Sequence, residues 1–213
     1  MRILFDTSAL LKRYLPEAGR ASLLDWIVRA RPVVVAPHCR VELYSALNRV
    51  RRDTQASEEA YRATCGEVER NFVDFDVVPM TTVLERASTR ALEASQIRAL
   101  DALHVGAAVV AGVVAARERI DDDPAATPTL AGLAASAGLS RYQFLRAFTR
   151  LTGLPPHAYL LQRRVQQARR LVLAGLPLAE VAAASGFADQ SHMTRAFARH
   201  LGITPGAFAT ARR

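Results

Sequence analysis

Apolar residues recur at helical spacing towards the end of the chain. Met193, Phe197 and Leu201 lie four residues apart, which places them along one side of a helix. Ser185-Gly186 interrupts a similar periodicity just upstream, and either Asp189 or Ser191 can cap the second helix through its side-chain oxygen. The pattern therefore predicts a helix, a glycine turn and a second helix, followed by a closing Thr-Pro-Gly turn.

The same pattern occurs once more, 49 residues upstream. There Gly138 marks the turn, Ser140 is the expected N-cap, and Phe144 and Phe148 fall on one face of the second helix. The segment between the two motifs, Pro155 to Gly175, is expected to be one connecting helix, because proline is tolerated in a first turn and glycine ends a helix.

The faces opposite the apolar stripes are polar and basic. In the first motif this face carries Tyr142, Gln143, Arg146 and Arg150, and in the second Gln190, His192, Arg195 and Arg199. A short helix that buries one face and exposes arginine and amide groups on the other suits a DNA major groove. We expect Arg150, Arg163, Arg170 and Arg199 to contact phosphates, and the other side chains to contact base edges. The alternative is a solvated helical bundle whose arginines bind nothing.

Charge is distributed unevenly along the 213 residues, half of which are apolar. Residues 1–112 have 15 Arg or Lys against 14 Asp or Glu, whereas residues 113–213 have 13 against 6. The basic excess belongs to the tandem motifs, as expected for a surface that binds phosphates of double-stranded DNA. The two cysteines, Cys39 and Cys65, have no metal-type spacing and are expected to be reduced.

Thr129 to Phe208 resembles the DNA-binding domain of the AraC/XylS family of transcription regulators. The resemblance rests on LAASAGLS, FLRAF, VAAASGF, DQSH, TRAF and GITP in this order. It implies that one helix joins two motifs and sets their second helices into successive major grooves. Two departures are Met193, where the family more often has an aromatic residue or Leu, and Phe208-Ala209, which replaces Tyr-Arg.

The first half of the chain alternates short apolar runs with helical patterns. Arg2 to Phe5, Pro32 to Ala36 and Asp76 to Met80 read as strands, and the β-branched second run suits a buried parallel strand. Strands that alternate with helices indicate an α/β fold with a parallel sheet.

Three acids of this half follow strands or begin helices: Asp6, Glu42 and Asp101. The carboxyl ends of parallel strands form the site crevice, so we expect Asp6 and Glu42 to project there. Gathered carboxylates suit Mg²⁺ or Mn²⁺, whose bound water can attack a phosphodiester. The alternatives are that Asp6 and Asp101 are helix N-caps and that Glu42 is a solvated helix residue.

MRILFDTSALLKRYLPEAG, VVVAPHCRVELYSALNRVRR and IRALDALHVGAAVV resemble successive motifs of PIN-domain nucleases, the fold of VapC-type toxins. The resemblance implies that Asp6, Glu42 and Asp101 bind the metal that drives RNA cleavage, with Thr7 or Ser8 as a supporting hydroxyl. His104 would be a core or supporting residue. The pattern is truncated, because a fourth acid and the last strands have no counterpart, and we do not expect Asp121, Asp122 or Asp123 to replace them.

These patterns divide the chain into a truncated PIN-like α/β domain, residues 1–112, and an all-α tandem helix-turn-helix domain, residues 113–213. No flexible linker separates them, and a helix near Val105 to Ile120 is expected either to be shared by the two domains or to mark where they abut. The predicted function is sequence-specific DNA binding in transcription regulation. The alternative is a Mg²⁺-dependent VapC-type endoribonuclease, which would also bind RNA.

Two further expectations concern partners and location. The missing strands would leave the first strand unpaired at a sheet edge, where a second copy of the chain can pair to form a homodimer. The charged first residues are no signal peptide, and the apolar run from Val105 to Ala116 is shorter than the roughly 20 residues that span a bilayer. We therefore expect a cytoplasmic protein.

Overall fold

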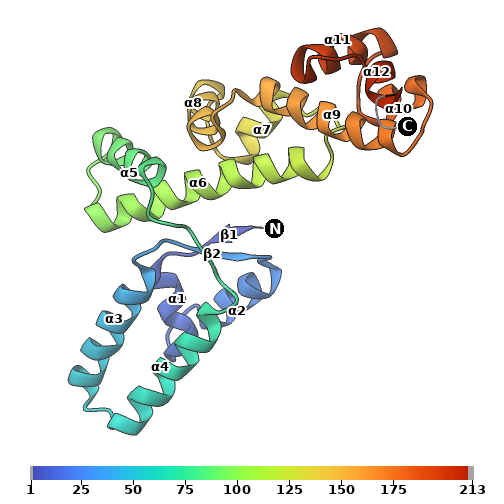
Figure 1. The fold of residues 1–213 in the computed structure, drawn as a ribbon. Coiled ribbons are helices and arrows are strands. Elements are labelled where there is room, and N and C mark those ends of the chain that lie inside the picture. Colours follow the sequence, from blue (N-terminus) through green and yellow to red (C-terminus); the bar gives the residue numbers. More distant parts are fainter. Residues whose placement is uncertain (1, 211–213) are drawn as a thin grey trace. The chain divides into compact units, whose positions relative to one another are not determined.

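A computed structural model describes residues 2–210 of the chain (Figure 1). The chain forms two compact units, residues 1–111 and 112–213, which are called unit 1 and unit 2 below. Each unit has its own hydrophobic core and is described by itself.

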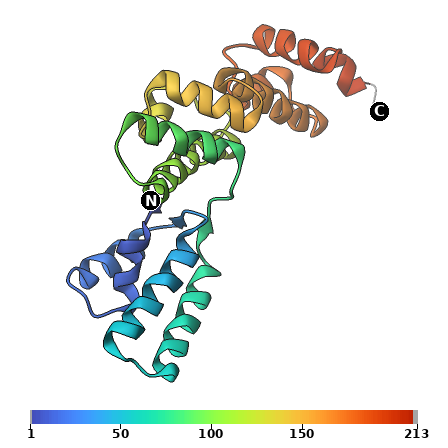
Figure 2. The ribbon, with the colours of Figure 1, turned by 90° about the vertical axis from the view of Figure 1, so that its left-hand side faces the viewer.

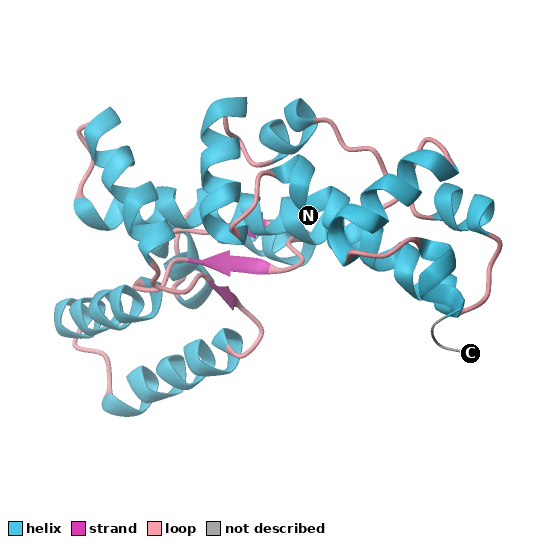
Figure 3. Cartoon of the chain, turned by 45° about the horizontal axis from the view of Figure 1, so that its top comes forward, coloured by secondary structure: helices cyan, strands magenta, loops and turns pink. Residues whose placement is uncertain are grey.

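Unit 1 contains a small parallel sheet (Figure 3). Its strands are β1 (Ile3–Leu4), β2 (Val33–Val35) and β3 (Asp76–Val77), in the order β1-β2-β3. Ile3 pairs with Val33 and Val34 pairs with Asp76. The strands are shorter than the predicted apolar runs, but single backbone hydrogen bonds extend the pairing by one residue, from Phe5 N to the Val34 carbonyl and from Val78 N to the Val35 carbonyl, both at 3.0 Å. Within the described residues β1 is an edge strand, as predicted.

Among the described residues, five helices lie wholly within unit 1: α1 (Thr7–Tyr14), α2 (Arg20–Arg29), α3 (Cys39–Thr54), α4 (Glu58–Phe72) and α5 (Thr82–Ala94). Helices α1 to α4 lie on the same side of the strands (Figure 1; Figure 2). Their buried residues form one core with the sheet, in which Leu10, Val35, Leu43 and Val68 have no exposed surface. The prediction of an α/β fold for this half is confirmed.

Helix α6 (Ala99–Asp122) belongs to both units. Ala102 and Ala107 are buried in unit 1, whereas Val113, Ala116 and Ile120 belong to a core of unit 2. Of the two expected arrangements, a shared helix or two abutting domains, the structure has the shared helix. At 24 residues α6 is long and apolar enough to cross a membrane. The expectation that this segment is too short to span a bilayer, which was drawn from Val105 to Ala116 alone, was therefore wrong for the whole helix. A helix in a protein core can be equally long and apolar, and several residues of α6 are buried inside the protein.

Unit 2 is all-helical, as predicted. Its helices after α6 are α7 (Leu130–Ser136), α8 (Arg141–Thr152), α9 (Pro156–Leu173), α10 (Leu178–Ala184), α11 (Gln190–Leu201) and α12 (Pro205–Thr210). One core forms around Phe144 and Phe148, and a second around Met193 and Phe197. Helix α9 contributes Leu160 to the first core and Val165 to the second, so it joins the two helix-turn-helix halves.

Caps and glycine turns determine where the helices of unit 2 begin. The Asp189 side chain accepts a hydrogen bond from His192 N at 2.6 Å and starts α11. At the turn before it, Gly186 has a φ of +76°, and a Cβ there would lie 2.6 Å from the Ala125 Cα, so only glycine fits. The predicted closing turn is instead the start of the short helix α12, which places Phe208 against Phe197 with ring centroids 5.6 Å apart.

Candidate DNA-binding surface and candidate metal centre

The polar face of α8 is solvent-exposed. Tyr142 is 66% exposed, and its hydroxyl accepts a hydrogen bond of 2.9 Å from Arg146, whose guanidinium also lies 5.4 Å from the Tyr142 ring centroid. Gln143, a predicted base contact, also caps α8. Its side-chain oxygen accepts a 3.0 Å hydrogen bond from Ser140 N and completes a capping box at the start of the helix. Arg150 is half-buried at the end of this face.

The polar face of α11 is exposed in the same way. Gln190, Arg195 and Arg199 are exposed, while Met193 and Phe197 on the opposite side are buried. His192 is half-buried, and its ring packs edge-on against Phe187 at 5.3 Å between centroids. Arg195 and Arg199 make no ion pair with another described residue, so their guanidinium groups are available to a ligand.

An acidic residue at the end of α6 ties this helix to α9. The Asp121 side chain accepts a hydrogen bond of 2.8 Å from the Tyr159 hydroxyl and lies 2.8 Å from Nε of Arg163. Burial, followed by the neighbouring Asp121, raises the pKa of Tyr159. Arg163, predicted as a phosphate contact, is therefore half-buried in an internal network. Arg170, the other predicted phosphate contact of α9, is exposed.

The loop after α6 is hydrogen-bonded to α9. Arg164 donates hydrogen bonds to the carbonyls of Pro124 and Ala126 at 2.8 and 2.9 Å, and burial lowers its pKa. The Asp123 side chain accepts hydrogen bonds from two backbone N–H groups of this loop. Asp121 and Asp123 thus have structural partners.

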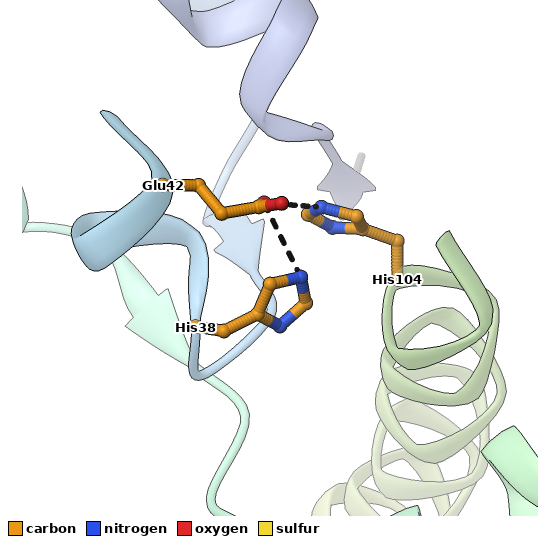
Figure 4. Close-up of side chains that lie close together, drawn as sticks. All are labelled: His38, Glu42 and His104. Atoms are coloured by element: carbon orange, nitrogen blue, oxygen red, sulfur yellow. Dashed lines mark hydrogen bonds and ion pairs between the residues drawn. The ribbon is translucent and has the colours of Figure 1, made fainter. Parts of the chain in front are cut away.

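In unit 1, Glu42 lies between two histidines (Figure 4). It is in the first turn of α3, four residues after His38, which is the N-cap residue of that helix. His104 comes from α6. Oε2 of Glu42 lies 3.3 Å from Nε2 of His38 and 3.2 Å from Nε2 of His104, and the Thr7 hydroxyl donates a hydrogen bond to the same oxygen.

Burial determines the charge of the groups around Glu42. Burial, then the nearby His104, lowers the pKa of His38, and Glu42 opposes this effect. Burial also raises the pKa of the Cys39 thiol to about 11. The His38 ring is therefore mainly neutral near pH 7, which leaves a lone pair on one ring nitrogen.

The other two predicted metal ligands lie outside this cluster. Asp6 is exposed and caps α1, with its side chain accepting hydrogen bonds from Ala9 N at 2.7 Å and from the Ser8 hydroxyl at 3.0 Å. Asp101 is also exposed, and it is not an N-cap because α6 begins two residues earlier, at Ala99.

The predicted all-oxygen set is therefore not assembled in the part of the chain that the structure describes. Among the described residues, the group whose potential ligand atoms all lie within 4.8 Å of one another is His38, Glu42 and His104. Metal binding by the three acids stays a prediction. His38 was not recognised from the sequence, although its spacing of four residues from Glu42 is the signal that could have identified it. Glu42 is not the isolated solvated residue of the alternative interpretation.

Two protein-family models match the chain. The model described as PIN domain matches residues 3–119, and the model described as Helix-turn-helix domain matches residues 133–211. Together they cover parts of both units.

Curated relatives match unit 2. An uncharacterized HTH-type transcriptional regulator, YbfI of Bacillus subtilis (strain 168), is 39% identical over 76 residues, which cover 36% of this chain and 28% of the relative. A putative AraC-like transcription regulator of Streptomyces antibioticus is 38% identical over 85 residues, which cover 39% and 28%. The matched part thus spans less than a third of the length of these relatives.

Solved structures also align with this half. The DNA-binding domain of AdpA, a global transcriptional factor solved with a target DNA, is 37% identical, with a TM-score of 0.43, 49% of this chain covered and 92% of that chain. An AraC-type transcriptional regulator from Chromobacterium violaceum is 24% identical, with a TM-score of 0.44, and the alignment covers 47% and 91% of the two chains.

Proposed function

The chain belongs to the PIN-domain family and carries an AraC-type helix-turn-helix domain, and from this premise we propose that it is a DNA-binding transcription regulator. Unit 2 recognises a specific sequence in double-stranded DNA, in the cytoplasm. The bacterial relatives that match unit 2 are described as transcription regulators, which supports this function.

The observation that carries the proposal is the repeated exposure of polar and basic side chains on α8 and α11. Each of these helices follows a glycine turn and buries apolar residues, at least one of them a phenylalanine, on its other face, so the exposed side chains are held by a packed core. A helix held in this way can enter a major groove with its side chains oriented towards base edges. Arg195 and Gln190 of α11 and Arg146 of α8 are the base-edge candidates, and Arg199 and Arg170 the phosphate candidates.

Selection of duplexes from a random pool by the full-length protein tests the proposal. We expect one sequence to be enriched. On that sequence Arg195→Ala should cost about 1–3 kcal/mol of binding free energy and relax the choice of base at one position. Arg49→Ala is the matched control, because Arg49 is an exposed arginine of α3 in unit 1 and its loss changes the net charge equally. It should leave the affinity unchanged.

Other outcomes would change or remove the proposal. If Arg195→Ala lowers the affinity for every duplex equally, and the affinity of the variant depends less on salt concentration, Arg195 is a phosphate contact. A pool with no enriched sequence would contradict sequence-specific binding. Sedimentation of the full-length protein tests the predicted homodimer, which would pair through β1 of unit 1, and a monomer at all concentrations would contradict it.

Metal-dependent cleavage of RNA is the second candidate function, and the match to the PIN domain favours it. It requires Mg²⁺ or Mn²⁺ bound by the carboxylates of Asp6, Glu42 and Asp101. Asp6 is an exposed N-cap, and it is not among the residues grouped around Glu42. Cleavage of a mixed RNA pool by the parent and by Asp6→Asn, with either metal, tests it. We expect no metal-dependent difference. Cleavage by the parent alone would make the enzyme the leading function.

A further inference from the structure

We propose that His38, Glu42 and His104 form a binding site for a divalent transition-metal ion of the Zn²⁺ and Co²⁺ class. This site uses two imidazole nitrogens and one carboxylate oxygen, whereas the predicted PIN-type site uses carboxylates alone. The proposal concerns unit 1 and is independent of DNA binding by unit 2.

The spacing of the donor atoms fits such an ion. Zn²⁺ binds imidazole nitrogen and carboxylate oxygen at about 2.0–2.2 Å, so two ligands in a tetrahedral arrangement lie about 3.3 Å apart. The Glu42 oxygen lies 3.3 Å from Nε2 of His38 and 3.2 Å from Nε2 of His104. The donor atoms of the three residues all lie within 4.8 Å of one another. Only small side-chain rotations are needed for them to converge on one ion.

The cluster is incompletely satisfied by its own hydrogen bonds. One oxygen of Glu42 faces two imidazole nitrogens as well as the Thr7 hydroxyl. Nε2 of His38 is buried and, despite its short distance to Glu42, makes no hydrogen bond of normal geometry with a described residue. A buried polar nitrogen without a partner is unfavourable because it has lost its contact with water. A bound cation would supply the missing interaction of Nε2 of His38, and Nε2 of His104, which lies 3.2 Å from the same Glu42 oxygen, would exchange that contact for the ion.

The donor types determine which metal is preferred. Mg²⁺ prefers six oxygen ligands and keeps several waters, whereas imidazole suits Zn²⁺, Ni²⁺ and related ions. Two histidines and one glutamate leave a fourth position open in a tetrahedral site. The Glu42 side chain is 26% exposed, against 12% for His38 and 10% for His104, so the site is reached from solvent on the Glu42 side. The open position would take water or an oxygen of a ligand.

Titration of the full-length, metal-free protein with Co²⁺ tests the site, because four-coordinate Co²⁺ absorbs visible light more strongly than hydrated Co²⁺. Equilibrium dialysis with Zn²⁺ gives the stoichiometry. We expect one equivalent of either ion to bind, with the Co²⁺ bands unchanged by excess Mg²⁺. His38→Gln and His104→Gln should each lower the Zn²⁺ affinity at least about tenfold, because even loss of an outer-shell partner commonly has this effect. At equal concentrations, Zn²⁺ should raise the thermal stability of the parent more than that of His38→Gln.

Three variants serve as controls. His157→Gln removes an exposed histidine of α9 in unit 2, and Asp6→Asn and Asp101→Asn remove the acids outside the cluster. All three should bind Zn²⁺ as the parent does. His38 is the N-cap residue of α3 but its side chain makes no capping hydrogen bond, so His38→Gln is expected to fold even if the loss of His104 disturbs unit 1. Unchanged Zn²⁺ affinity in His38→Gln, or displacement of Co²⁺ by Mg²⁺, would overturn the proposal.

Discussion

In unit 2 each set of candidate DNA-binding side chains comes from one helix. In unit 1 the candidate metal site instead brings Glu42 together with His104, which lies 62 residues further along the chain. A helical face is determined by local spacing, so Arg195 must lie opposite Met193 and Phe197 wherever α11 packs. The position of His104 relative to Glu42 depends instead on how α6 packs against the start of α3. The comparison shows that a surface built from helix faces needs little beyond its helices, whereas a cluster of side chains needs the whole fold of its unit.

Removal of a core aromatic residue should have the largest effect and should test whether the units are independent. Phe197→Ala leaves a cavity where α9, α10 and α11 meet, and we expect a loss of about 3–5 kcal/mol of stability. DNA binding should disappear, as measured by titration of the selected duplex alongside urea unfolding.

Leu43→Ala in the core of unit 1 is the matched variant, with an expected cost of about 2–5 kcal/mol. It should destabilise unit 1 and leave DNA binding in place. Loss of DNA binding in both variants would mean that the two units unfold together through the shared helix α6.

Asp121→Ala should have the next largest effect. It leaves Tyr159 and Arg163 without their partner at the contact between α6 and α9, and a loss of about 1–3 kcal/mol is expected from unfolding by urea. Asp122→Ala removes the same charge from the neighbouring, exposed position and should change stability by less than about 0.5 kcal/mol. Equal effects of the two changes would show that the network is not specific.

The two N-cap aspartates allow a direct comparison of the units. Asp6→Ala and Asp189→Ala should each cost about 1 kcal/mol, because each leaves a backbone N–H at a helix start without its acceptor. Only Asp189→Ala should also weaken DNA binding, since α11 carries the exposed arginines. Asp6→Asn should retain most of the stability, because asparagine is a good N-cap. A large loss of stability in Asp6→Asn would indicate that the charge of Asp6 has a role beyond capping.

The smallest expected effect concerns the cysteines. Cys39 is fully buried and its pKa is raised to about 11, so at pH 8 iodoacetamide should modify the half-buried Cys65 and leave Cys39 unmodified. Mass spectrometry of peptides identifies the modified residue. The affinity for DNA should not change, because Cys65 belongs to unit 1. Rapid modification of Cys39 would show that the core of unit 1 opens on the time scale of the reaction.

Several features of the candidate sites were predictable from local sequence. The exposure of Arg146 and Arg195 and the burial of Phe144 and Phe197 follow from helical spacing, and the structure agrees with them. The use of Gln143 in a cap was also readable, since Ser140 and Gln143 have the spacing of a capping box, but it was interpreted only as a contact to DNA. The contact of His192 with Phe187 depends on the turn geometry between α10 and α11, which spacing alone does not specify.

The sequence alone determined the two fold classes, the tandem motifs and the basic surface, because apolar periodicity, caps and glycine turns act over a few residues. Only the tertiary structure decided that Glu42 lies with His38 and His104 while Asp6 remains an exposed cap. It also decided that α6 is one helix with buried residues in both units and that Asp121 binds Tyr159 and Arg163. These contacts join residues distant in the chain, and packing between helices, rather than local spacing, determines which distant side chains meet.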